Sequence, residues 1–226
     1  MDLGSQAAGI GVLADDTRRA LYEYVVSQAD PVGREQAATA VGLPLHRASF
    51  HLDRLVAEGL LEVEFRRLTG RTGPGAGRPS KLYRRAAREF AVSLPARRYD
   101  LVGDILAAAV TRAAEGASLE RSLDECARDE GLDIGRAVTG PGDPDSVDAL
   151  AEVLSTQGYE PYVEEGTVVL ANCPFDSLAR KHTDLVCGLN RSFVQGVADG
   201  LGCDVSASLD PAPERCCVTA RRPAPR

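Results

Sequence analysis

The chain has 226 residues, 44% of them hydrophobic and 26% charged, and a formal net charge of −7 at pH 7. It is long enough for two small globular domains with real cores. No run approaches the roughly 18 apolar residues of a membrane span, and the opening residues MDLGSQAAGIGVLADD lack the basic and apolar regions of a signal peptide. We therefore expect a soluble, cytoplasmic protein with no membrane partner, whose cysteines serve metal or redox chemistry rather than structural disulfides.

Basic residues are concentrated in one part of this acidic chain. Residues 65–98 contain ten Lys and Arg residues and one acid, Glu89. Local positive charge of this kind is expected where a protein contacts a polyanion such as nucleic acid. The alternative is a basic face that is only solvated.

Three short helices are predicted in the first 60 residues, at 17–28, 34–41 and 45–60. Asp15 and Asp16 can cap the first helix. Gly42 is a natural C-cap for the second helix, and Pro44 suits the first turn of the third. When a basic hairpin comes next in the chain, this succession is typical of a winged helix-turn-helix.

The third predicted helix has two unlike faces. Its apolar face carries, at i, i+3 and i+4 spacing, Leu45, Ala48, Leu52, Leu55 and Val56. Its opposite face carries Arg47, Phe50 and Arg54, flanked by His46 and His51. Arginine and histidine donate to base edges and phosphates, and phenylalanine can lie against a thymine methyl group. The alternative is that Phe50 packs on a neighbouring element while the arginines are solvated.

A basic hairpin is predicted after this helix. The alternating segment 60–68 indicates a half-buried strand, and residues 81–85 return as a second strand. The basic residues of this hairpin are Arg66, Arg67, Arg71, Arg78, Lys81 and Arg84. A nucleotide-binding loop is disfavoured for the glycines of the tip because no helix follows them. Contact with a phosphate backbone would offset the entropy cost of ordering such a tip.

The stretch GLPLHRASFHLDRLVAEGLLEVEFRR, residues 42–67, resembles the recognition helix and first wing strand of ArsR-type winged-helix repressors. GRPSKLYR, residues 77–84, resembles the second wing strand of the repressors of iron–sulfur assembly (SUF) operons. The resemblance implies a homodimer that places one recognition helix in each half-site of a double-stranded DNA operator. It implies DNA contacts from Leu45, His46, Arg47, Ser49, Phe50, His51 and Arg54, and from the wing residues Arg67, Arg71, Arg78 and Lys81.

The chain after the hairpin is predicted to continue with helices. Apolar residues from Leu101 to Ala113 indicate an amphipathic helix that starts at Tyr99. In a two-fold DNA-binding protein such a helix commonly packs on its twin, and the alternative is packing within the chain. Two further helices, the first of which contains Cys126 as a core or bystander residue, are expected at about 118–137 and 146–158.

The last third of the chain alternates strands with a helical segment. Strands are expected at 159–165, 167–173, 203–210 and 215–220, around a helical segment at 175–202. Two hairpins beside a helix give a small α/β unit. The fold class is therefore expected to be α+β. Its predicted parts are a winged helix-turn-helix domain at 1–92, linking and dimerisation helices at 93–138, and a cysteine-bearing sensor domain at 139–226.

Cys173 and Cys187 lie in the stretch NCPFDSLARKHTDLVCGLN. On one straight helix they would be about 21 Å apart along the axis. Thiolates that share a tetrahedral metal lie within about 4 Å of each other. If the two cysteines act together, the helix must break between them, and we favour a break at HTD, residues 182–184, with Thr183 capping the new helix.

The cysteines of the last hairpin cannot all join one centre. Cys203 and Cys216 would stand about 20 Å apart along their strands, so Cys203 is expected in the core. Cys216 shares the more apolar face of its strand, although a slip of one residue would exchange it for Cys217. The most coherent ligand set is Cys173, Cys187 and Cys216.

This set resembles the cysteine domain of the SUF repressors, which binds an iron–sulfur cluster. In that family too an Asn-Cys segment precedes a helix, and the last cysteine lies on the final strand. The chain departs from the family after Cys187, where Gly188-Leu189-Asn190 stands in place of the expected His-Glu. The resemblance implies a cluster held by Cys173, Cys187 and Cys216, with His182 as a candidate fourth ligand. The alternatives are structural zinc, or a reversible disulfide between Cys173 and Cys187.

These features predict a DNA-binding transcriptional regulator, expected to be a repressor, whose cysteines sense redox or iron–sulfur status. Two other classes compete with it: a winged helix used as a protein-interaction module, and a thiol or metal enzyme. We expect no enzymatic activity, because the sequence contains no nucleophile elbow, P-loop, paired-histidine metal motif or acid pair in a convincing context.

Overall fold

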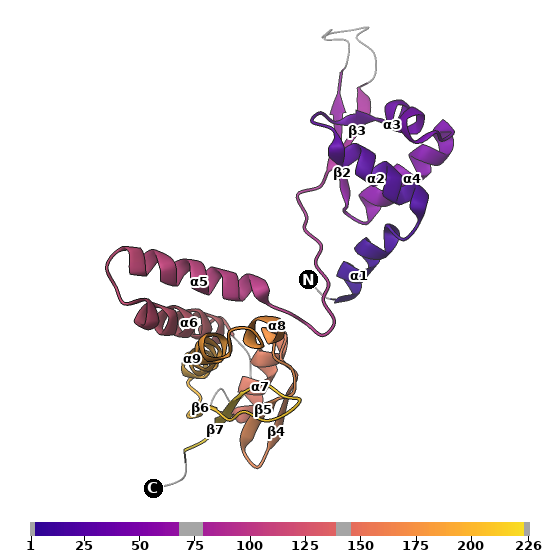
Figure 1. The fold of residues 1–226 in the computed structure, drawn as a ribbon. Helices are drawn as coiled ribbons and strands as arrows, with labels where there is room; N and C mark the ends of the chain where they lie inside the picture. Colours follow the sequence, from indigo (N-terminus) through magenta and orange to yellow (C-terminus); the bar gives the residue numbers. More distant parts are fainter. Residues whose placement is uncertain (1–2, 68–78, 139–145, 224–226) are drawn as a thin grey trace. The chain divides into compact units, whose positions relative to one another are not determined.

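The computed structural model describes residues 3–67, 79–138 and 146–223. The chain divides into two compact units, Met1–Val92 and Ser93–Arg226 (Figure 1). The described part of each unit combines helices with an antiparallel sheet, which confirms the predicted α+β class. The second unit contains both the predicted linking segment, 93–138, and the cysteine-bearing segment, 139–226. In the described ranges, no helix is long and apolar enough to cross a membrane.

The described part of the first unit contains the helices α1 (Leu3–Val12), α2 (Asp16–Ser27), α3 (Arg34–Val41) and α4 (Leu45–Ala57), and the strands β1 (Val32–Gly33), β2 (Leu61–Arg66) and β3 (Ser80–Arg85). The three predicted helices are confirmed as α2, α3 and α4. Helix α2 begins after Asp15, whose carboxylate accepts the Arg18 backbone N–H at 2.9 Å. Helix α3 ends at Gly42 with φ 68°, a left-handed conformation that glycine adopts without steric cost.

Helix α1 is not predicted by the sequence, because LGSQAAGIGV has several glycines and no sustained apolar stripe. Its position depends on the segment that follows β3. A Cβ at Gly9 would lie 2.0 Å from the Phe90 ring, so the ring occupies the space that a side chain would need. Gln6 Oε1 also accepts the Ala91 N–H at 3.2 Å. Tertiary packing therefore stabilises this helix more than local propensity does.

The predicted hairpin is confirmed as the antiparallel pair β2 and β3. The register runs from Leu61 opposite Arg85 to Arg66 opposite Ser80. Strand β1 pairs with the other edge of β3, which gives the order β1-β3-β2. The largest fully buried side chains of this unit, contributed by the helices and the sheet, are Leu21, Leu52, Leu55, Leu61 and Tyr83.

The described part of the second unit contains the helices α5 (Tyr99–Ala114), α6 (Leu119–Arg136), α7 (Val147–Thr156), α8 (Asp176–Ala179) and α9 (Thr183–Leu201), and the strands β4 (Pro161–Glu164), β5 (Thr167–Leu170), β6 (Ser206–Leu209) and β7 (Val218–Arg221). The two predicted hairpins, β4–β5 and β6–β7, join through β5 and β7 into one antiparallel sheet of order β4-β5-β7-β6. Helices α7 and α9 pack on the sheet, whose buried residues include Val168, Leu170, Val218 and Ala220.

Helices α6 and α9 cross at very short range. A Cβ at Gly131 of α6 would lie 2.2 Å from a backbone oxygen of α9, and one at Gly196 of α9 would lie 2.1 Å from a backbone oxygen of α6. Gly135 and Gly200 stand against the opposite backbone in the same way. Any larger residue at these positions would force the two helices apart.

The predicted helix break between Cys173 and Cys187 is confirmed, since α8 ends at Ala179 and α9 begins at Thr183. The predicted cap is wrong in detail. His182 is the N-cap residue, and the hydroxyl of Thr183, the first helical residue, donates to the Ala179 carbonyl oxygen at 2.8 Å. This hydroxyl therefore links the two helices instead of capping the second.

The predicted amphipathic helix is confirmed as α5, and most of its apolar stripe is used within the chain. Leu101, Val102, Ile105 and Ala109 are buried in the core of the second unit, where α5 packs along α6. Val110 remains 58% exposed. Packing within the chain, rather than packing on a twin helix, therefore accounts for this stripe, and its buried residues are not available to a second protomer.

Candidate functional site

The exposed face of α4 is the first candidate site. Arg47 and Phe50 are exposed, Phe50 to 67%, while Leu52 and Leu55 are fully buried on the other side of the helix. The Arg47 side chain makes no hydrogen bond or ion pair with another described residue. The helix therefore presents a cation and an aromatic ring outward, as expected, and keeps its aliphatic side chains inside.

The other contact residues predicted on α4 differ in their availability. Leu45 and His46 are exposed, and Ser49 is half-buried. Arg54 is exposed, but its guanidinium pairs with Glu58 at 2.6 Å. Arg54 must therefore exchange this partner, or share it, in order to bind a phosphate or base.

His51 is buried, with 9% of its surface exposed. Its ring packs edge-on against Phe50, with centroids 5.3 Å apart, and among the described residues its Nδ1 has no hydrogen-bond partner. Position 51 lies on the flank of α4, three residues after Ala48 and four before Leu55, and the packing of the first unit buries its side chain. We therefore leave His51 out of the candidate interface.

The hairpin contributes basic residues beside α4. Arg67 is exposed. The Lys81 ammonium pairs with the Asp53 carboxylate of α4, which also accepts the Tyr83 hydroxyl at 3.0 Å. The hydrogen bond to Asp53 raises the pKa of Lys81 and ties β3 to α4. The other two predicted wing contacts, Arg71 and Arg78, lie outside the described residues.

The cysteines of the second unit form the second candidate site. Cys187 on α9 forms a disulfide with Cys217, which precedes β7, and their Cα atoms are 6.5 Å apart. Cys173, after β5, and Cys216 are free thiols of the same core, and the Cys216 backbone N–H donates to the Leu170 carbonyl oxygen at 2.8 Å. The alternative pairing of Cys173 with Cys187 is therefore wrong for this structure. Cys216 and Cys217 lie just before β7, which begins at Val218, and not on the strand as predicted, and the two residues reach different partners.

The Cys173–Cys216 pair is an asymmetric pair of thiols. The hydrogen bond that Cys173 donates to the Cys216 sulfur, together with burial, raises the pKa of Cys173 far above the usual value of a thiol. The same bond lowers the pKa of Cys216 to about 7, although burial acts in the opposite direction. Asn190 Nδ2 donates a further hydrogen bond to the Cys216 sulfur at 3.1 Å. Cys216 is therefore the thiol of this pair that holds a negative charge more readily.

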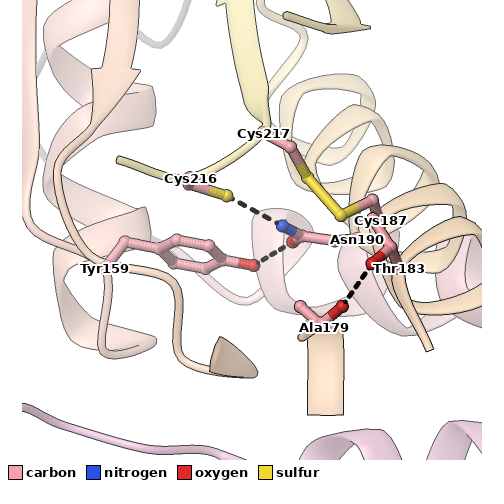
Figure 2. The surroundings of a disulfide bond; sticks show 7 residues. All are labelled: Tyr159, Ala179, Thr183, Cys187, Asn190, Cys216 and Cys217. Carbon is pink, nitrogen blue, oxygen red and sulfur yellow. Dashed lines mark hydrogen bonds between the residues drawn. A yellow bond between two sulfur atoms is a disulfide. The ribbon is translucent and has the colours of Figure 1, made fainter. Parts of the chain in front are cut away.

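Asn190 is itself held in place by Tyr159. The Tyr159 hydroxyl donates to Asn190 Oδ1, and both side chains are buried (Figure 2). Because its oxygen is engaged, the Asn190 amide presents its NH₂ group to Cys216. Asn190 also follows Cys187 on α9 by almost one helical turn, so this turn of α9 contributes to both cysteine pairs (Figure 2).

The loop that carries Cys173 also binds the start of the second unit. Arg97 Nη1 donates to the Asn172 side-chain oxygen and to the Cys173 carbonyl oxygen, both at 2.7 Å. The Arg98 backbone N–H donates to the Pro174 carbonyl oxygen at 3.2 Å. Residues 96–98, through which the chain enters α5, are therefore held by residues 172–174.

The predicted cluster ligands do not meet while the disulfide is present. Cys173 and Cys216 are paired, but Cys187 is bonded to Cys217, and a disulfide sulfur cannot act as a thiolate ligand. In the described part of the chain, no three His, Cys, Asp or Glu side chains are arranged to hold a metal ion. His182 is exposed at the start of α9. An iron–sulfur cluster or a zinc ion therefore does not fit this pairing, and either would require the disulfide to be reduced first.

Sequence reasoning missed several residues that complete the thiol site, namely Tyr159, Asn190, Arg97 and Asn172. A partial signal exists for Asn190, because a buried amide within one turn of a cysteine on an apolar helix needs a polar partner. Cys126 and Cys203 are buried and belong to neither pair, as expected for core residues.

Comparison with known proteins identifies no family, since neither a scan against protein-family models nor a search of curated proteins finds a match for this chain. Its function must therefore be inferred from the geometry of α4, of the hairpin and of the cysteine pairs.

Proposed function

We propose that the chain is a DNA-binding transcriptional regulator and that residues 1–92 form a winged helix-turn-helix domain. The observation that carries the proposal is the outward face of α4, where Arg47 and the 67% exposed Phe50 lie above a fully buried aliphatic face. The order of the elements supports it. Helices α3 and α4 are joined by residues 42–44, and a basic hairpin follows α4 directly, as in proteins that insert one helix into the major groove.

In this proposal α4 enters the major groove and the hairpin lies along the adjacent backbone. Arg47 is suited to a guanine edge or a phosphate, and the Phe50 ring to a thymine methyl group. Arg67 neutralises a phosphate. Lys81 has a positioning role as well, because its ion pair with Asp53 sets the hairpin against α4.

The proposal includes a homodimer on a two-fold operator, because each protomer offers one helix to one half-site. The buried residues of α5 are excluded from the dimer contact by their packing against α6. The exposed side of α5, which includes Val110, remains available.

We propose that the second unit senses redox state through its cysteines, and that the regulator acts as a repressor. A cluster on Cys173, Cys187 and Cys216 is implied by the family resemblance alone and requires the reduced chain, and zinc on the same residues is its alternative. One observation favours a thiol–disulfide switch over both, namely the disulfide between Cys187 and Cys217.

Binding of the full chain to the double-stranded DNA upstream of its own coding region tests the proposal. Arg47→Ala should weaken specific binding by about 1–3 kcal/mol if Arg47 contacts a base, and Phe50→Ala should weaken it in the same direction. Arg121→Ala is the control, because it removes the same charge from a side chain on α6 that is 76% exposed. If both α4 variants bind as tightly as the control, the proposed interface is wrong, and the exposed face of α4 serves another partner.

A further inference from the structure

The two faces of the sheet in the second unit have different surroundings. Helices α7 and α9 pack against the face that carries Val168 and Val218, which are buried in the core. The residues that alternate with these along β5 and β7 point to the other face. A hollow of about 610 Å³ lies over that other face and is lined by residues of β4, β5 and β7. This volume is within the range of small-molecule binding sites.

The first of two rows of side chains across the hollow is uncharged. Tyr162 of β4 stands opposite Val169 of β5, which stands opposite Thr219 of β7. Val169 and Thr219 are 8% and 4% exposed, whereas Tyr162 is 47% exposed. The hollow therefore reaches down to buried residues and has an accessible aromatic ring on its β4 side, which offers a contact surface to an apolar group.

The second row places opposite charges on the two sides of a threonine. Glu164 stands opposite Thr167, which stands opposite Arg221. Both charged side chains are exposed, and neither makes an ion pair or hydrogen bond with another described residue. Glu164 and Arg221 are two strand spacings apart, which separates their Cα atoms by about 10 Å. Thr167 is therefore flanked by a carboxylate on one side and by a guanidinium on the other.

A second cation belongs to the lining of the hollow. Arg215, from the segment between β6 and β7, donates through Nη2 to the Asp210 carboxylate at 2.7 Å, and its side chain is 19% exposed. Among the described residues its buried Nη1 has no hydrogen-bond partner. Leaving a buried donor of a charged group unsatisfied costs free energy. A negative group in the hollow would offset part of this cost through its charge.

We propose that this hollow binds a free α-amino acid with an apolar side chain. The ligand carboxylate pairs with the Arg221 guanidinium, the ligand ammonium pairs with the Glu164 carboxylate, and the ligand side chain lies against Tyr162 and Val169. The Thr167 hydroxyl lies between the two charges and can accept from the ammonium or donate to the carboxylate. The site uses neither the α4 face nor the cysteine pairs, and it goes beyond the proposed function.

The charges of the second row decide the ligand class. A simple anion at Arg221 would lie beside the Glu164 carboxylate with nothing to offset the repulsion, and a simple amine at Glu164 would meet Arg221 in the same way. In an amino acid the carboxylate and the ammonium are attached to one carbon, so one small molecule supplies a partner to both residues. The uncharged row favours an apolar ligand side chain, because contact with the Tyr162 ring removes the surfaces of both from water.

Calorimetric titration of the full chain with L-leucine and with L-phenylalanine tests the ligand class. Both amino acids should bind. L-leucinamide lacks the carboxylate and isocaproate lacks the ammonium, so each should bind about tenfold more weakly than L-leucine, or worse, because each loses one charge-assisted contact. If neither amino acid binds, or if isocaproate or L-leucinamide binds as tightly as L-leucine, the hollow is not a site for a zwitterion.

Two variants test the partner of each ligand charge. Arg221→Gln should bind L-leucine about tenfold more weakly than the wild type and should no longer distinguish it from L-leucinamide. Glu164→Gln should weaken binding to a similar extent and should no longer distinguish L-leucine from isocaproate. Arg191→Gln is the control, because it removes an exposed arginine of α9 that does not line the hollow, and it should bind like the wild type. Wild-type discrimination in both test variants would overturn the assigned contacts.

Nuclear magnetic resonance of the isotope-labelled full chain locates the bound ligand. Saturation with L-leucine should shift the amide signals of β4, β5 and β7, with the largest shifts at Thr167 and Thr219, and should leave those of α6 unchanged. Largest shifts outside these strands would overturn the site even if the amino acid binds. Because the titrations use neither DNA nor an oxidant, a chain that binds L-leucine here but ignores DNA would contradict only the proposed function. A chain that binds DNA but no amino acid would contradict only this site.

Discussion

Replacing Gly196 by alanine tests the close crossing of α6 and α9. The new Cβ would lie 2.1 Å from the Arg128 carbonyl oxygen, a distance that Cβ atoms essentially never show, since even contacts under 3.0 Å require a shift. The obstacle is backbone, so no side-chain rotation can relieve it. The two helices must therefore separate by about 1 Å or more, and the core between them must lose contacts.

The magnitude results from two opposing effects. Overpacking of a core costs about 1–3 kcal/mol, and a backbone obstacle places this case at the upper end. Alanine is favoured over glycine inside a helix by about 1 kcal/mol. The net loss in the free energy of unfolding is therefore about 2 kcal/mol, which for a unit of this size lowers Tm by roughly 6–8 °C.

Urea unfolding of the full chain, followed by far-UV circular dichroism, measures this loss. Gly188→Ala is the matched control, because it makes the same change on the same helix at a position where an added Cβ meets no atom within 4 Å. This control should be as stable as the wild type or more stable by about 0.5–1 kcal/mol. If Gly196→Ala behaves like Gly188→Ala, the two helices do not pack at this distance.

Three further results are expected. Ser146→Ala removes the hydroxyl that accepts the Ala149 N–H at 3.0 Å and should destabilise the second unit by about 1 kcal/mol in thermal unfolding, whereas Ser155→Ala on the exposed side of α7 should not. Arg67→Ala should lower the slope of log affinity against log salt by about one, equally for operator and random DNA, and a loss confined to one sequence would place Arg67 on a base. On anaerobic reconstitution the wild-type protein should retain iron and sulfide only after its disulfide has been reduced, and the Cys187→Ala variant should not retain them. A reduced wild-type protein that stays colourless would contradict the cluster prediction.

Most elements of the fold are encoded by short-range sequence signals. Asp15 and Gly42 delimit helices through caps that act within one turn, and the alternation of 60–68 indicates a strand without reference to its partner. Helix α1 lacks such signals. Its Gly9 is meaningful only beside Phe90, a residue far along the chain that fills the space next to it.

The candidate interface on α4 was also predictable from short-range signals, with His51 as the exception. Helical spacing places Arg47 and Phe50 outward whatever the rest of the chain does. His51 lies between the polar and apolar faces, where spacing alone does not decide. Burial in the first unit assigns it to the core.

By itself the sequence determined the α+β class, the outward face of α4, and the helix break that lets Cys173 and Cys187 lie in one region. Only the tertiary structure decided how the thiols pair. Cys216 and Cys217 are neighbours with different partners, and these partners depend on how the segment before β7 lies between the end of β5 and α9. No local pattern encodes that placement, because it results from long-range strand pairing and from the buried Tyr159–Asn190 hydrogen bond that turns an amide toward Cys216.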